Sequence, residues 1–208
     1  MDALNEPAVR RGLWMLAAVL TAWGLAVAAA AAAGLYQAID PMWIGPLLVL
    51  GIIVPTVAYA VMPAFQRVIA AIGIRRLTMF HIWRIAAAML FFWWGAAGKL
   101  PETFVRHAGW GDLIAGGLAL TVILLPENRG RYAFMHLVGL ADFVLALGTG
   151  LVLTRMGDPL MDGIRTLPIA LIPLFGVGVT GASHLMAFDL LRHGAGAPER
   201  PSRIIMAE

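Results

Sequence analysis

Residues 132–156, YAFMHLVGLADFVLALGTGLVLTRM, decide the class of the fold. Only His136, Asp142 and Arg155 in this stretch carry a basic or acidic side chain, and the rest is mostly aliphatic, aromatic or small. The stretch is longer than the roughly 20 residues that an α-helix needs to cross a bilayer. We therefore predict a transmembrane helix here.

The same pattern recurs along the chain, which is 61% hydrophobic and 13% charged. A soluble domain of this length carries about a quarter charged residues, so lipid is the solvent that this composition suits. We predict an all-α integral membrane bundle of about six transmembrane helices. We expect residues 1–193 to form a single transmembrane domain, and residues 194–208, rich in Pro and Arg, to form a flexible cytoplasmic tail. The other five predicted segments are residues 13–39, 43–65, 78–98, 113–125 and 167–191.

The distribution of Lys and Arg predicts the orientation, because cytoplasmic loops are enriched in these residues. With the N-terminus inside, ten basic residues fall on the cytoplasmic side, against Lys99, Arg106, Arg155 and Arg165 outside. We expect both termini of this multi-pass membrane protein to be cytoplasmic. The ten are Arg10, Arg11, Arg67, Arg75, Arg76, Arg129, Arg131, Arg192, Arg200 and Arg203.

Composition excludes several classes of function. The chain has no cysteine, which excludes disulfides, thiolate metal sites and iron–sulfur clusters. The basic residues are spread over short loops and form no patch for nucleic acid. No nucleophile–base arrangement or phosphate-binding loop is recognisable, so an enzyme is not indicated. The expected partners are the lipid bilayer and, in an assembly, other membrane subunits or further copies of the chain.

Four ionisable residues at membrane depth are the candidate site: His81, Arg84, Asp142 and His184. Ionisable groups inside a bilayer are costly and usually face the protein interior. Helical periodicity places each of them on a face with small residues, as Asp142 is with Gly139. Small residues let membrane helices approach closely, so we expect these side chains to point at helix–helix contacts.

Several interpretations of this polar group are open. Arg84 and Asp142 can form an internal ion pair that only fixes packing. They can also form a proton- or anion-handling site for small-solute or proton transport, with His184 as the titrating member. His184 paired with His81 or His136 can also ligate a b-type haem, which makes an electron carrier. A purely structural subunit of a membrane complex is the remaining alternative. No metal motif with tight spacing is present.

Two polar stretches lie between the predicted helices. Residues 99–112, KLPETFVRHAGWGD, are expected to form an outer loop, with a tight turn at Gly109 and Gly111 and with Asp112 as the N-cap of the next helix. Residues 66–77, QRVIAAIGIRRL, form a basic and weakly amphipathic connector that fits the inner membrane surface.

Three stretches carry a resemblance: GKLPETFVRHAGWGDLIAGGLA (98–119), GLADFVLALGTG (139–150) and LPIALIPLFGVGVTGASHLM (167–186). The chain resembles a loose group of uncharacterised bacterial multi-pass inner-membrane proteins, although Lys99 departs from their pattern. The group has no assigned activity, so the resemblance implies a bacterial inner membrane and a polar interior. The matching positions are Leu100, Pro101, Phe104, Ala108, Gly109, Gly111, Asp112, Gly139, Asp142 and His184.

Overall fold

The structure is a computed structural model that describes residues 3–196. These residues form helices joined by short turns, without a strand among them. Six of the helical segments are long and apolar enough to cross a membrane, which confirms the predicted all-helical bundle. They are Pro7–Ala32, Pro41–Val61, Pro63–Ala96, Glu102–Leu124, Arg129–Arg155 and Ile172–Arg192.

Several spans combine shorter helical elements. The 3₁₀ turns are η1 (Ala3–Asn5), η2 (Pro41–Trp43), η3 (His81–Trp83) and η5 (Pro159–Arg165), and the π-helical turns are η4 (Val105–Gly109) and η6 (Ile172–Gly176). The α-helices are α1 (Pro7–Ala32), α2 (Leu35–Ala38), α3 (Ile44–Val61), α4 (Pro63–Phe80), α5 (Arg84–Ala96), α6 (Glu102–Phe104), α7 (Trp110–Leu124), α8 (Arg129–Arg155) and α9 (Val177–Arg192).

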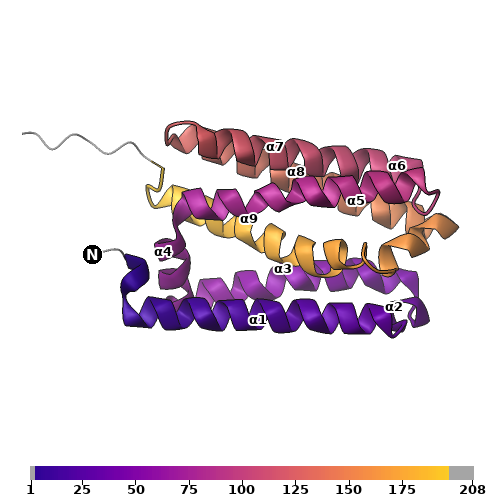
Figure 1. Ribbon diagram of the computed structural model, residues 1–208, viewed down its shortest axis with the longest axis horizontal. Coiled ribbons are helices and arrows are strands. Elements are labelled where there is room, and N and C mark those ends of the chain that lie inside the picture. The colour runs from indigo at the N-terminus through magenta and orange to yellow at the C-terminus, as the bar shows by residue number, and fades with distance from the viewer. Residues whose placement is uncertain (1–2, 197–208) are drawn as a thin grey trace, which may run out of the picture.

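Helix α9 lies between two groups of helices, with α1 and α3 on one side and α5, α7 and α8 on the other (Figure 1). It packs against α3, α4 and α8, while α7 packs against α5 and α8. Small residues allow the close contact with α3: a Cβ on Gly178 would lie 2.9 Å from the carbonyl oxygen of Gly51. Helix α1, by contrast, buries only Val9, Val27 and Ala31. The bundle therefore has a well-packed centre and a peripheral first helix.

The fourth span begins about ten residues earlier than predicted. Residues 99–112 are not an outer loop: α6 begins at Glu102, directly after the extended Pro101, and continues through η4 into α7. Gly109 is the last residue of the π-helical turn η4 and Gly111 lies in the first turn of α7, so both are part of this helix. The prediction that Asp112 caps a helix is therefore wrong, since Asp112 lies inside the helix and is buried.

The basic connector is helical and bends sharply at Gly73. Gly73 has a φ of 74°, which a glycine adopts without strain, and the chain before it crosses one end of the bundle (Figure 1). Val68 and Ile69 are buried, whereas Arg67 and Arg76 are exposed. The amphipathic pattern predicted from the sequence is thus present as a short helix.

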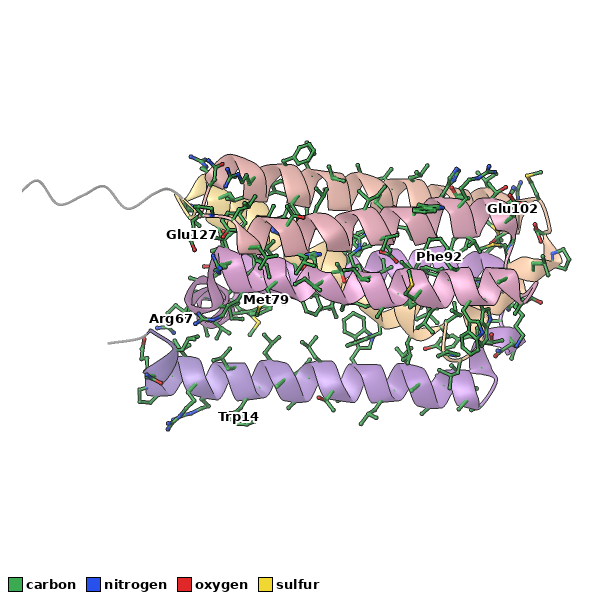
Figure 2. The ribbon with its side chains drawn as sticks, turned by 45° about the horizontal axis from the view of Figure 1, so that its top comes forward. Trp14, Arg67, Met79, Phe92, Glu102 and Glu127 are labelled. Atoms are coloured by element: carbon green, nitrogen blue, oxygen red, sulfur yellow. The ribbon has the colours of Figure 1, made fainter. Side chains whose placement is uncertain are left out.

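Both described ends of the chain lie at the same end of the bundle, beside Arg67 and Glu127 (Figures 1 and 2). A chain that runs the length of the bundle an even number of times begins and ends at the same end of it. Of the predicted flexible tail, residues 197–208 lie outside the described residues. Residues 194–196 form a turn in which Gly196 is buried, and a Cβ added there would lie 2.9 Å from the ring of Tyr132.

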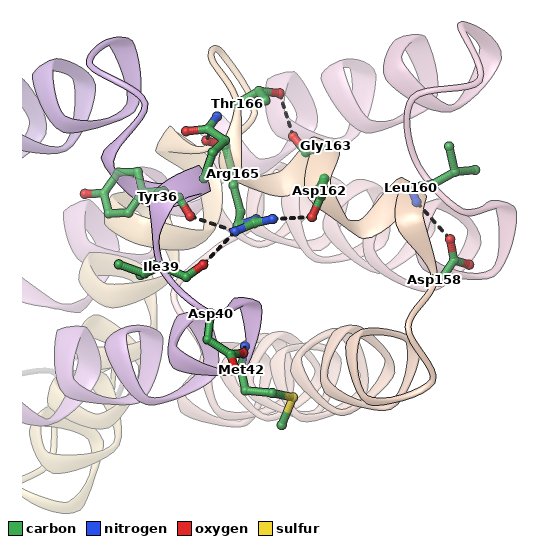
Figure 3. Close-up of polar contacts among 11 residues, drawn as sticks. Tyr36, Ile39, Asp40, Met42, Asp158, Leu160, Asp162, Gly163, Arg165 and Thr166 are labelled. Atoms are coloured by element: carbon green, nitrogen blue, oxygen red, sulfur yellow. Dashed lines mark hydrogen bonds and ion pairs between the residues drawn. The ribbon is translucent and has the colours of Figure 1, made fainter.

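The opposite end of the bundle is tied together by Arg165 in η5 (Figure 3). Its guanidinium donates to the carbonyl oxygens of Tyr36 at 2.8 Å and Ile39 at 3.0 Å, and it forms an ion pair with Asp162. In return, the side-chain amide of Gln37 donates to the carbonyl oxygen of Arg165 at 2.9 Å. These bonds hold the loop after α1 against the loop after α8.

Candidate functional site

The first part of the site is a buried ion-pair triad formed by Arg84, Asp112 and Asp142. Arg84 begins α5 and is fully buried. Its Nε donates to Asp112 Oδ1 on α7 at 2.6 Å, its Nη2 donates to Asp142 on α8, and its Nη1 donates to the carbonyl oxygen of Gly139 at 3.3 Å. The planar guanidinium, with donors pointing in several directions, suits this three-helix contact.

The triad holds more negative than positive charge. Two carboxylates face one guanidinium, so the formal sum with ionised carboxylates is −1. Asp142 Oδ1 has no hydrogen-bond partner among residues 3–196. This oxygen lies so close to Gly111 that a Cβ on that glycine would overlap it. Helices α7 and α8 therefore approach closely at the triad only because residue 111 is a glycine.

The second part of the site is a histidine cluster formed by His81, His136 and His184. The three residues come from η3, α8 and α9, and all are fully buried. The Nδ1 atoms of His136 and His184 are hydrogen-bonded at 2.8 Å, and the ring centroids of His81 and His184 are 4.1 Å apart. One nitrogen from each ring lies within 4.8 Å of the other two. Such a group of nitrogens can hold a metal ion.

Hydroxyl groups from neighbouring helices orient two of the imidazoles. Thr78 Oγ1 lies 3.0 Å from His136 Nε2, and Ser183 Oγ lies 3.1 Å from His81 Nε2. The other side-chain nitrogen of His81, Nδ1, and the Nε2 of His184 have no partner among the described residues. A buried polar atom without a partner is uncommon and calls for an explanation.

Gly139 and Phe143 on α8 connect the triad to the histidine cluster. The ring of Phe143 lies 4.5 Å from Arg84 Cζ and 5.6 Å from the ring of His184. A Cβ on Gly139 would lie 2.5 Å from His184 Cε1 and 3.0 Å from Arg84 Nη1. The two parts thus form one contiguous polar region inside an otherwise apolar bundle.

An interior cleft reaches the triad from the end of the bundle opposite the termini. Its cavity volume is about 70 Å³, and both Asp112 and Asp142 line it. Its outer residues include Pro41, Met42 and Thr154, at the ends of the spans. The remaining walls are mainly apolar, with Phe91, Phe104, Phe143, Leu147 and Leu151 among them.

The structure brings all four predicted site residues, His81, Arg84, Asp142 and His184, into this one region. It also places His136 in the histidine cluster. Sequence reasoning missed three participants: Asp112, Thr78 and Ser183. A signal existed for Asp112, because on an uninterrupted helix it shares a face with the small residues Ala108, Ala115 and Ala119. Thr78 and Ser183 carried no comparable signal, because hydroxyl side chains are common in membrane helices.

The histidine geometry does not fit the predicted haem. Axial ligands of a haem lie on opposite faces of the macrocycle. The ring of His184 is in direct contact with those of His81 and His136, at centroid distances of 4.1 and 5.0 Å. A porphyrin has no space between either pair of rings in this arrangement.

A comparison with family models places this site inside one matched region. The model described as Domain of unknown function (DUF8737) matches residues 41–192, which include the triad, the histidine cluster and both oriented hydroxyls. Helix α1 lies before the matched region. No curated protein and no solved structure matches the chain.

Proposed function

We propose that this chain, which belongs to the family described as Domain of unknown function (DUF8737), carries small solutes across a membrane. The solute would bind at the ion-pair triad, where the interior cleft ends. One observation carries this proposal. The interior cleft ends on two carboxylates at the middle of the bundle, where ionisable groups usually mark a transport pathway. A pair that only fixed packing would need a single carboxylate and no cleft.

The chemistry of the cleft indicates the class of solute. The triad contributes a formal excess of one negative charge, and the walls above it are aromatic and aliphatic. Pockets of this kind bind ligands through apolar contact and use a few polar groups for orientation. A small organic cation with an apolar body matches both features.

We infer the orientation from the basic residues and the location from the resemblance described above. The excess of Arg at the end of the bundle that carries the termini supports a cytoplasmic position for both termini. The resemblance to bacterial multi-pass proteins supports the inner membrane. In this orientation the interior cleft faces the outer side of that membrane, and the solute enters from there.

Uptake of benzyltrimethylammonium, a permanent cation with an apolar ring, tests the carrier function. The full chain is reconstituted into proteoliposomes, and uptake is compared with that of empty liposomes. Asp142→Asn should reduce uptake at least tenfold, because the substitution keeps the size of the side chain and removes the excess charge. Asp158→Asn is the matched control, since Asp158 only accepts a bond from the backbone of Leu160 at the surface. Uptake equal to that of empty liposomes, or unchanged in Asp142→Asn, would refute the carrier.

A role as a subunit of a larger membrane complex is the second candidate, and the loose packing of α1 favours it. An apolar groove of about 510 Å³ lies between α1 and α3. In a complex, a neighbouring helix would fill this groove. Mass measurement of the chain extracted from its own membrane in native nanodiscs tests this candidate: additional chains support it, and a monomer with lipid only refutes it.

A further inference from the structure

We propose that the histidine cluster is a binding site for a transition-metal ion of the copper or zinc type. Three fully buried imidazoles from three different elements offer nitrogens within 4.8 Å of one another. Imidazole nitrogen is a preferred ligand of both metals. The inference concerns residues other than the triad and does not depend on the carrier function.

Unpartnered nitrogens provide an independent indication of a ligand. His81 Nδ1 and His184 Nε2 are buried without a hydrogen-bond partner in the described part of the chain. Leaving such an atom unpaired costs free energy in any interior, and more in a membrane, where water cannot replace the partner. A metal ion at His81 Nδ1 would engage a lone pair that the protein itself leaves unused, since Ser183 Oγ bonds the other nitrogen of that ring.

The two hydroxyls have the positions expected of partners that orient metal-binding histidines. Histidines that bind a metal usually donate their other ring N–H to an oxygen, which fixes the tautomer. Thr78 Oγ1 beside His136 Nε2 and Ser183 Oγ beside His81 Nε2 can each accept such a bond. Both bonds hold the ring at Nε2 and leave Nδ1 available for the metal.

Only a small rearrangement is needed to admit the ion. The Nδ1 atoms of His136 and His184 are 2.8 Å apart and share a proton. Metal–nitrogen bonds of about 2.0–2.1 Å in a trigonal or tetrahedral site separate their nitrogens by about 3.3–3.6 Å. The two rings must therefore move apart by about 1 Å or less. The metal then replaces the hydrogen bond between them, and the proton of that bond moves from His184 Nδ1 to His184 Nε2, the unpartnered nitrogen of the same ring.

The charge around the cluster favours binding of a cation. The neighbouring triad carries the formal excess of one negative charge, and no carboxylate belongs to the cluster itself. Three neutral imidazoles with no thiolate match either monovalent copper or zinc with an open fourth position. Arg84 opposes the cation locally, but its charge is matched by the two carboxylates that it contacts.

Metal titration of the full chain in detergent tests the proposal, with separate arms for the two ions. Cu⁺ is titrated against bicinchoninate and Zn²⁺ against 4-(2-pyridylazo)resorcinol, both chromophoric competitors. At least one ion should bind at one per chain, and His136→Asn and His184→Asn should weaken it more than tenfold. His107→Asn is the matched control, because His107 lies outside the cluster and contacts Thr149.

Variants of the two hydroxyls distinguish a metal site from a merely packed group of histidines. Thr78→Val and Ser183→Ala keep all three imidazoles, and they should weaken binding about 10–100-fold while the stoichiometry stays at one. These variants also keep the test valid if a histidine variant fails to fold. The proposal is overturned if neither ion binds at one per chain, or if binding is the same in Thr78→Val, Ser183→Ala and His107→Asn. The titrations measure metal binding and not solute uptake, so a failure of the carrier proposal would not change their result.

Discussion

Arg84 and Arg165 are the two buried arginines that form ion pairs with aspartate in the described chain, and they differ in what surrounds them. Arg165 ties two loops at the end of the bundle and uses two backbone carbonyls and one aspartate, Asp162, whose side chain is 63% exposed. Arg84 lies between α7 and α8 and contacts two buried carboxylates. Arg165 Nε has no partner among the described residues, but the one carboxylate that Arg165 contacts is exposed, so water solvates its charge.

This difference shows which of the two arginines has more buried charge around it than folding requires. Burying an ion pair gives little net stability, because desolvation offsets the attraction. A second buried carboxylate, with one unpartnered oxygen, adds a further cost that packing alone does not require. The interior cleft ends at the Arg84 group. We infer that the fold maintains the triad for function and Arg165 for structure.

The largest expected effect comes from removing each arginine in turn. Arg84→Met leaves two uncompensated buried carboxylates and should lower the free energy of unfolding by about 3–5 kcal/mol. Arg165→Met leaves two carbonyls without a donor and should cost about 1–3 kcal/mol. Unfolding by SDS in mixed micelles, followed by tryptophan fluorescence, measures both. Equal losses would remove the distinction between the two arginines.

Alanine substitutions at two glycines of α7 test how closely α7 packs against α8 at the triad. Gly111→Ala inserts a methyl group against Asp142 and should cost about 1–3 kcal/mol, because α7 and α8 must separate. Gly117 has no atom near its Cβ position, so Gly117→Ala should be neutral or stabilise the helix by about 0.5–1 kcal/mol. The same unfolding assay compares the two variants. A neutral Gly111→Ala would show that the triad is not closely packed.

The smallest expected effect is at Asp162. Asp162→Asn should cost less than about 1 kcal/mol, because the carboxylate is largely exposed. Salt should reduce this cost further, whereas the effect of Arg84→Met should be insensitive to salt, since buried pairs are poorly screened. Repeating the unfolding assay at low and high NaCl tests this point. A salt-dependent Arg84→Met effect would show that dissolved ions screen the triad as they screen a surface pair.

The sequence predicted the spans and the inward-facing ionisable residues well, because both depend on local patterns. Long apolar runs define the spans, and small residues on the same face as Asp142 and His184 indicate helix contacts. The partner of Arg84 on α7 was not predictable in the same way. Gly109 and Gly111 suggested a turn, and that reading assigned Asp112 to a cap, whereas a π-helical turn keeps the helix intact.

Contacts between helices were the part that the sequence could not provide. Arg84 is separated by 28 residues from Asp112 and by 58 from Asp142, and no local pattern links them. The meeting of His136 with His184 likewise depends on how α8 packs against α9. His136 was associated with His184 only through the haem alternative, which the close ring contacts do not fit.

Cysteine accessibility on α8 tests most directly whether a water-filled cleft reaches the triad. The chain has no cysteine, so single substitutions can be introduced without a prior variant. Ala146 lines the interior cleft, whereas Val144 is 69% exposed on the outer face of the same helix, toward lipid. A charged methanethiosulfonate reagent modifies hydrated thiols, so Ala146→Cys should react in the membrane and Val144→Cys should not. An unreactive Ala146→Cys, or equal reaction of both, would contradict the account.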